Sequence, residues 1–215
     1  MRSSHNRSLP PPGHPPDLSL STVAARGNSV EVELKYIGAD LDQVRERLRE
    51  AGARLEGPRS LETNATFDDA AGSLRNSERL LRLRDGNELT VKIPVDDEKF
   101  KSRREITAHV ADGNIEEILG ALGYRPTWRY EKYREGWDLD GMWVTLDEMP
   151  FVGPVVEIEG ERDRIDATAE KLGLSGVRTS TGNYRSLYEA YRAEHGLPPG
   201  DMTFTAEAEA RASTS

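Results

Sequence analysis

Charged side chains stand at every second position in several short stretches of the sequence, and the carboxylates among them could bind a metal ion. These carboxylates belong to Glu31, Glu33, Asp147, Glu157 and Glu159. Oxygen donors without a neighbouring histidine or cysteine are the ligands that Mg²⁺ or Mn²⁺ prefers. The sequence contains no cysteine, which excludes disulfides, thiolate metal sites and cysteine nucleophiles. We therefore expect one or two Mg²⁺ or Mn²⁺ ions to bind these carboxylates.

Basic side chains follow the same alternation and could hold phosphate groups. They belong to Lys35, Arg82, Arg84, Lys92, Arg103, Lys132 and Arg134. Arginine grips phosphate oxygens with two parallel hydrogen bonds, whereas lysine acts as a point charge. With Glu105 added to the five carboxylates, seven basic side chains face six acidic ones, a net charge near +1. A triphosphate with about four negative charges complements this set once one or two divalent ions have bound.

An alternation of period two is typical of β-strands, because successive side chains of a strand point to opposite faces. We predict strands over residues 30–37, 60–68, 79–85, 88–94, 101–110, 127–137, 142–147 and 152–159. We predict helices over residues 41–51, 115–122, 163–172 and 183–195. Eight strands joined mostly by hairpins indicate an α+β fold, an eight-stranded antiparallel β-barrel with flanking helices.

Two arrangements would place the charged side chains on one face of this sheet. In an ordinary sheet the charged face lies in water. In an inverted barrel the charged side chains line the lumen and the apolar ones face the helices. Charged pairs recur on nearly every predicted strand and are sorted by sign, which favours the inverted barrel. A charged lumen is costly unless its charges are paired or neutralised, so this arrangement also predicts a ligand.

The totals exclude some classes of partner. The chain has 215 residues with 29 basic and 38 acidic side chains, a net charge of −9, which disfavours nucleic acid as a partner. No stretch approaches the roughly 20 apolar residues that cross a bilayer, so we expect a cytoplasmic protein without a membrane partner. We predict a disordered proline-rich leader over residues 1–28, a folded domain over 29–197 and a flexible tail over 198–215.

The motifs together resemble those of the CYTH superfamily, named for class IV adenylate cyclases and thiamine triphosphatases. Glu31, Glu33 and Lys35 match its ExExK signature. The companion motifs follow in the expected order at residues 81–84, 90–92, 103–106, 131–134, 146–147 and 153–159. The resemblance covers roughly residues 29–195. It implies the triphosphate tunnel fold, a tunnel of eight antiparallel strands, in agreement with the inverted barrel.

Within the superfamily, residues 122–132 and 151–159 look most like class IV adenylate cyclases, which implies conversion of ATP to cyclic AMP and pyrophosphate. The alternative is a triphosphatase that hydrolyses inorganic tripolyphosphate or thiamine triphosphate. In either reaction we expect Lys35, Arg103 and Asp147 to be catalytic, with the other basic residues holding the phosphate chain. Two residues depart from the family pattern, Thr107 in place of a frequent Glu and Asn183 in place of a usual Ser.

A third hypothesis for the function is a non-catalytic module that binds polyphosphate or a nucleotide. The acidic set argues against it, because binding alone needs the basic residues and not three groups of carboxylates. The substrate is in each case a small triphosphate. For the oligomeric state, a homodimer is an alternative to a monomer, since dimers are known among the cyclase-like relatives.

Overall fold

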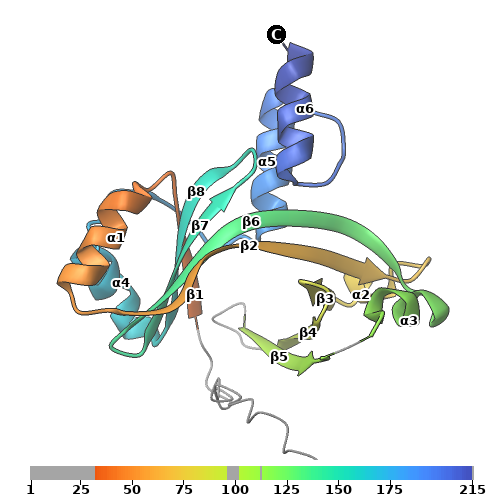
Figure 1. Cartoon of the computed structure of the whole chain (residues 1–215), viewed down its shortest axis with the longest axis horizontal. Coiled ribbons are helices and arrows are strands. Elements are labelled where there is room, and N and C mark those ends of the chain that lie inside the picture. Colours follow the sequence, from red (N-terminus) through yellow and green to blue (C-terminus); the bar gives the residue numbers. More distant parts are fainter. Residues whose placement is uncertain (1–31, 96–101, 112, 215) are drawn as a thin grey trace, which may run out of the picture.

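The computed structural model describes residues 32–95, 102–111 and 113–214. In this part of the chain, nine strands form one antiparallel sheet in the order β5-β4-β3-β2-β6-β7-β8-β1-β9. Their bounds are β1 Val32–Ile37, β2 Arg54–Asp68, β3 Leu80–Arg84, β4 Glu88–Val95, β5 Ser102–His109, β6 Arg125–Leu139, β7 Met142–Met149, β8 Gly153–Gly160 and β9 Arg178–Ser180. The sheet is strongly curved, with β2 and β6 as long arcs across its middle (Figure 1).

The predicted closure into an eight-stranded barrel is not confirmed. The eight predicted strands are present, but a ninth strand, β9, pairs with β1 through the register Lys35–Ser180 to Ile37–Arg178. Because β8 pairs with the other side of β1, β1 has no free edge left for β5. The described sheet is therefore open, with β5 and β9 at its two edges.

Bulges and close glycine contacts bend the two longest strands. The pairing of β2 with β6 shifts register between Leu55 and Gly57, between Gly57 and Ser60, and between Thr66 and Phe67. Such irregularities increase the local twist of a strand. At Gly136, opposite Gly57, an added Cβ would lie 2.7 Å from the ring of Trp143. Glycine is therefore required at position 136, where the ring of Trp143 packs directly against the backbone of β6.

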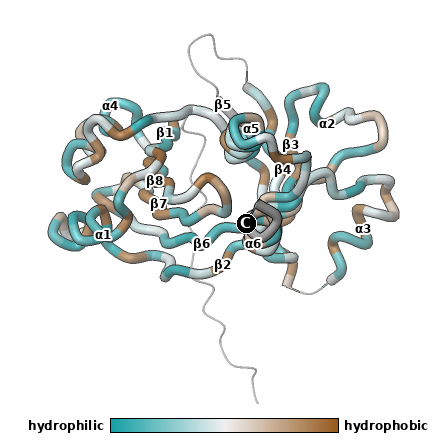
Figure 2. The backbone as a smooth tube through the Cα atoms, turned by 90° about the horizontal axis from the view of Figure 1, so that it is seen from above, coloured by the Kyte–Doolittle hydropathy of each residue, from teal (hydrophilic) through white to brown (hydrophobic). Residues whose placement is uncertain are grey.

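Helices cover the outer face of the sheet at two places. Helices α1 (Leu41–Glu50) and α4 (Arg162–Lys171) pack on β7 and β8, and the core there includes Val44, Leu48 and Ile158. Helices α2 (Ser73–Asn76) and α3 (Ile115–Ala121) lie beside β2 and β3, where Phe67 and Leu119 are buried. Figure 2 shows hydrophobic and hydrophilic residues mixed along these strands. The buried apolar side chains of these strands pack against the helices, as the inverted arrangement requires.

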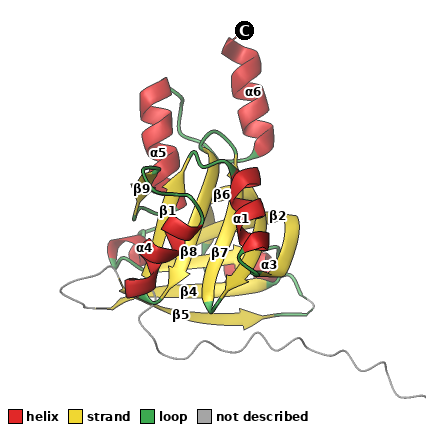
Figure 3. Cartoon of the chain, turned by 90° about the vertical axis from the view of Figure 1, so that its left-hand side faces the viewer, coloured by secondary structure: helices red, strands yellow, loops and turns green. Residues whose placement is uncertain are grey.

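The C-terminal part contains two helices, one of which lies within the tail predicted over 198–215. Helices α5 (Tyr184–His195) and α6 (Phe204–Thr214) both project from the same end of the sheet, apart from each other (Figures 1 and 3). Between them Met202 is fully buried and forms a bridge with Tyr130 of β6. Asp201 and Phe204 add further contacts, since Asp201 accepts a hydrogen bond from the backbone N–H of Arg129 and the ring of Phe204 lies 5.1 Å from that of Tyr133. The predicted leader over 1–28 lies outside the described residues, and no described helix has the length and apolar character to cross a membrane.

Candidate functional site

The cross-strand register brings most of the predicted site residues onto one face of the sheet. Directly opposed residues of antiparallel strands share a face. The opposed pairs are Glu33–Glu159, Lys35–Glu157, Arg134–Asp147, Glu62–Lys132, Arg84–Glu88 and Lys92–Glu105. We call the side that carries these residues the charged face. It is the face opposite α1 and α4, and many of its side chains are buried.

Asp147 is the centre of this network and is fully buried. Arg134 donates two hydrogen bonds to its carboxylate, from Nε to Oδ1 and from Nη2 to Oδ2, each 2.7 Å long. The ammonium group of Lys132 lies 3.4 Å from the same Oδ2. A buried carboxylate is tolerated only when charged partners and hydrogen bonds replace its hydration. Asp147 therefore acts here as the anchor that fixes the Arg134 guanidinium.

Glu157 is the second buried carboxylate and links β8 to β1 and β6. Lys35 Nζ lies 3.4 Å from its Oε1, and Arg134 Nη2 lies 3.1 Å from its Oε2. Burial raises the pKa of Glu157, but Lys35 and Arg134 lower it more, so the pKa lies well below its usual range. The neighbouring Glu33 accepts from Lys35 at 2.5 Å. Its pKa is raised by burial of its carboxyl group and by the adjacent Glu157.

Tyr184, which was not among the predicted site residues, contacts both buried carboxylates. Its hydroxyl donates to Asp147 Oδ2 at 2.5 Å and also bonds to Glu157. Burial and the charge of Asp147 raise its pKa well above 10, so the phenol stays protonated and can donate. Its ring lies 4.6 Å from the ammonium group of Lys132 and 5.2 Å from that of Lys35, which favours both cations.

Helix α5 positions Tyr184 through its first turn. The side chain of Asn183 accepts a hydrogen bond from the backbone N–H of Ser186 at 2.8 Å. Asparagine and serine are equivalent helix N-caps, so the departure from the family pattern at Asn183 keeps the cap. The signal that could have found Tyr184 is its place directly after this cap, in the closing segment of the resemblance.

Glu62 on β2 is a second residue of the site that was not predicted from the sequence. Its Oε1 lies 3.3 Å from Lys132 Nζ, and its Oε2 lies 3.3 Å from Arg84 Nε. Glu88 continues the cluster, since its Oε1 lies 3.3 Å from Arg84 Nη1 and 3.1 Å from Arg82 Nη2. These two carboxylates hold three cations in place. Glu62 was not predicted because the next residues on its face of β2, Asn64 and Thr66, are uncharged, so it has no charged neighbour at period two.

Replacing Glu62 by glutamine is expected to reduce the acid sensitivity of the fold. Burial raises the pKa of Glu62, but Lys132, Arg134 and Arg84 lower it more, from 4.5 to about 2. A lowered folded-state pKa contributes stability above the unfolded pKa, and this contribution is lost as the pH falls through about 2. The shift corresponds to about 3 kcal/mol.

Urea unfolding at pH 5 and at pH 2 measures this loss. The wild type should lose about 3 kcal/mol more than Glu62→Gln across the interval. Glu56→Gln, a substitution of a partly exposed acid on the same strand, serves as the control and should follow the wild type. An unchanged pH dependence in Glu62→Gln would show that Lys132 and Arg84 do not hold its carboxylate.

Most of the predicted site residues are connected. One network consists of Lys35, Lys132, Arg134, Asp147, Glu157 and Glu33. Glu62 joins this network to Arg84, and Glu88 joins Arg84 to Arg82. Lys92 pairs with Glu105 near the β5 edge, apart from these clusters. Glu159 lies opposite Glu33 in the register. Glu31 and the side chain of Arg103 lie outside the described residues.

The carboxylates of β1 and β8 fit a divalent cation by their chemistry. Among the described residues no three carboxylate, histidine or cysteine side chains converge on one point. Glu33 and Glu157 are nevertheless adjacent, and their mutual repulsion raises the pKa of Glu33. A hard cation between two such oxygen donors would relieve that repulsion. Asp147 differs from them, because Arg134, Lys132 and Tyr184 already satisfy its oxygens.

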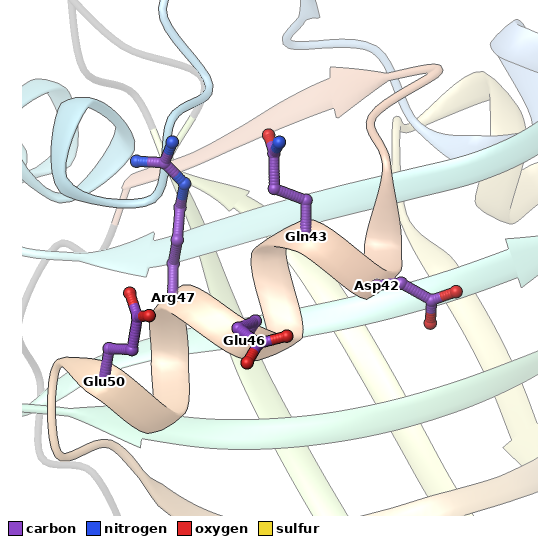
Figure 4. Close-up of a pocket in the computed structure, with 5 residues that line it drawn as sticks. All are labelled: Asp42, Gln43, Glu46, Arg47 and Glu50. Atoms are coloured by element: carbon purple, nitrogen blue, oxygen red, sulfur yellow. The ribbon is translucent and has the colours of Figure 1, made fainter.

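A hollow on the outer surface lies away from the charged face. Figure 4 shows five side chains around it, all from α1, at Asp42, Gln43, Glu46, Arg47 and Glu50. Helix α1 packs against the opposite, apolar side of the sheet. The hollow therefore has no connection to the charged network.

An open antiparallel sheet with a buried charged face and an apolar face under helices places the chain among the α+β proteins built on one antiparallel sheet. The chain belongs to the CYTH domain family, whose model matches residues 29–181. This match confirms the resemblance drawn from the motifs. No curated protein matches the chain in sequence.

Solved structures share the fold. The PH1819 protein of Pyrococcus horikoshii OT3 is 29% identical, with a TM-score of 0.57, covering 75% of this chain and 99% of that chain. A candidate adenylate cyclase from Vibrio parahaemolyticus is 17% identical, with a TM-score of 0.60, covering 74% and 98%. The candidate adenylyl cyclase HpAC1 from Hippeastrum, described as revealing a dominant triphosphatase activity, is 16% identical, with a TM-score of 0.50, covering 79% and 96%.

Proposed function

We propose that this protein is a divalent-metal-dependent enzyme that acts on a triphosphate at the charged face and converts ATP to cyclic AMP and pyrophosphate. One observation supports the triphosphate most directly. Lys35, Lys132 and Arg134 lie in a single buried network, where a polyanion would bind with little competition from water. The likeness of residues 122–132 and 151–159 to class IV adenylate cyclases supports the cyclase reaction.

The charge balance explains why the proposed enzyme needs a divalent ion. The described cations of the network are already paired with carboxylates, so a triphosphate alone would have to compete with Glu33, Glu157 and Glu62. Glu33, Glu157 and Glu159 would hold the cation, whose positive charge would balance these carboxylates and leave the ammonium group of Lys35 available to a phosphate oxygen. The sequence also predicts Glu31 and Asp147 as ligands of the divalent ion.

The residues of the charged face have distinct roles in the proposed reaction. When bound, the divalent ion supplies positive charge that neutralises phosphate oxygens. Arg134 and Lys132 bind and orient the phosphate chain, and Asp147 holds Arg134 for this task. The 3′-hydroxyl oxygen of ATP attacks the α-phosphorus, the bond to the leaving pyrophosphate breaks, and the hydroxyl proton is released to water. The basic side chains stabilise the charge that grows on pyrophosphate.

A triphosphatase is the second candidate, and the arrangement of the cations is equally compatible with it. The contacts of the network join cations and carboxylates that suit a phosphate chain, whether or not a nucleoside is attached. HpAC1, described as revealing a dominant triphosphatase activity, shares this fold. In that reaction water attacks the terminal phosphorus, the bond from this phosphorus to the bridging oxygen breaks, and orthophosphate and the shortened chain leave. The same cations would bind the chain.

Product analysis separates the two reactions. The protein is incubated with ATP, tripolyphosphate or thiamine triphosphate, with Mg²⁺ or Mn²⁺, and the products are separated by chromatography. Cyclic AMP with pyrophosphate is the expected result. Orthophosphate from tripolyphosphate or thiamine triphosphate would support the triphosphatase instead. An absence of turnover with all three substrates would contradict both and leave a binding module.

A further inference from the structure

Asn64 on β2 carries a buried acceptor that the charged network does not use. The residue is 4% exposed and lies on the charged face, opposite Arg84 of β3 and Tyr130 of β6. Its Nδ2 donates to Glu62 Oε1 at 2.9 Å. Its Oδ1 is buried and has no hydrogen-bond partner in the described part of the chain. Buried side-chain oxygens are normally satisfied, so this one indicates a missing donor.

The neighbours of Asn64 fix the orientation of its amide. Glu62 lies between the cations Lys132 and Arg84, so its carboxylate is ionised and only accepts hydrogen bonds. The amide nitrogen of Asn64 must therefore face Glu62. The amide oxygen is left pointing away from this contact, and a flip of the amide would lose the bond to Glu62.

A bare phosphate chain cannot satisfy this oxygen. Ionised phosphate oxygens are acceptors, so they suit the cations and also the Nε of Arg82, which is buried without a hydrogen-bond partner. They have no proton to give to Asn64. A hydroxyl or amino group attached to the phosphate chain does have one. The unmatched acceptor is therefore complementary to an organic substituent of the triphosphate.

Asn64 is also placed where such a substituent would lie. It stands two residues along β2 from Glu62, about 7 Å, and Glu62 contacts Lys132 directly. The carboxylates Glu33 and Glu157 lie at the far side, on β1 and β8. A phosphate chain held by Lys132 and Arg134 thus has the proposed metal site at one end and Asn64 near the other.

We propose that Asn64 Oδ1 accepts a hydrogen bond from a hydroxyl or amino group in the nucleoside part of the substrate, so that the site selects a nucleoside triphosphate over inorganic tripolyphosphate. The inference rests on the proposed function, which supplies the triphosphate itself. It adds a residue that distinguishes the two candidate substrates.

Calorimetric titration of ATP and tripolyphosphate tests the proposal, with Ca²⁺ in place of Mg²⁺ so that a divalent ion neutralises the carboxylates while turnover is slowed. Asn64→Ala should raise the Kd for ATP about tenfold and change the Kd for tripolyphosphate less than about twofold. Asn87→Ala, the same substitution at an exposed turn, should change neither. Equal weakening of both ligands by Asn64→Ala, or no weakening of ATP, would overturn the proposal. Failure of the wild type to bind either ligand would contradict the proposed function itself.

A second variant separates the acceptor from its structural role. Asn64→Asp keeps an acceptor oxygen but adds negative charge beside Glu62. We expect it to weaken both ligands and to keep the ratio of their Kd values within about twofold of the wild type. A ratio shifted as in Asn64→Ala would overturn the proposal. Thermal unfolding of each variant shows that the sheet is intact.

ATP analogues identify the donating group. The set is 2′-deoxy-ATP, 3′-deoxy-ATP and purine riboside triphosphate, which lack one ribose hydroxyl each or the 6-amino group. The analogue without the donor should bind the wild type about tenfold more weakly than ATP and should be insensitive to Asn64→Ala. If all three analogues bind like ATP and respond to the substitution like ATP, the proposal is wrong.

Discussion

Replacing Glu33 or Glu159 by alanine is expected to abolish the metal-dependent turnover of the triphosphate and to leave the sheet folded. The two residues are opposed in the register of β1 and β8, and Glu33 lies beside Glu157. Loss of a residue that merely supports a metal ligand costs about 10- to 100-fold in affinity or activity, so loss of a ligand should cost at least about 100-fold. Lys35 keeps its contact with Glu157 in Glu33→Ala, so the strand should stay in place.

Glu105→Ala is the matched control. The Glu105 side chain is 46% exposed and pairs with Lys92, while that of Glu33 is 44% exposed and pairs with Lys35. The two substitutions thus remove the same group from the same kind of pair, on opposite parts of the sheet. Initial rates measured over a range of Mg²⁺ concentrations should fall only a few-fold in the control. Full activity in both Glu33→Ala and Glu159→Ala would disprove the metal assignment.

Asp147→Asn is expected to lower the free energy of unfolding by about 3 kcal/mol. The substitution removes the charge that Arg134 and Lys132 share, and Lys132 is almost completely buried. Removing one partner of a buried pair costs about 3 to 5 kcal/mol, because the other charge stays behind. The lower end applies here, since Glu157 remains 3.1 Å from the Arg134 guanidinium.

Glu148, the residue after Asp147, forms an exposed ion pair whose strength can be compared with that of the buried one. Glu148 accepts two hydrogen bonds from Arg59, at 2.7 and 2.9 Å, but both side chains are more than 40% exposed. Glu148→Gln should therefore cost at most about 1 kcal/mol. Urea unfolding of both variants at pH 7 measures the difference. Similar losses would mean that burial does not set the strength of the Asp147 pair.

The sequence predicted the strands and the charged face well because both depend on local patterns. Alternation in β1, β6 and β8 is visible in a few consecutive residues, and the apolar side chains between the charges determine which face the helices cover. The same short patterns carried the resemblance to the CYTH family. Register then followed in the structure from packing these apolar faces.

The missed features depend on contacts between distant segments. Whether the sheet closes depends on which strand takes the free edge of β1, and the three residues of β9 carry no strand pattern. Tyr184 reaches Asp147 only because α5 docks at the end of the sheet. Glu62 has no charged side chain two residues further along β2, so nothing in the local sequence marks it as the partner of Lys132.

The pairing of β1 with β8 has a consequence for the order of folding. Lys35 lies near the start of the described chain, whereas its partners Glu157 and Tyr184 lie near the end. Contacts between such distant segments carry a high loop-closure cost and are slow to form. During synthesis, Lys35 has left the ribosome long before Glu157 exists. The cation network is thus assembled only after nearly the whole domain has been made.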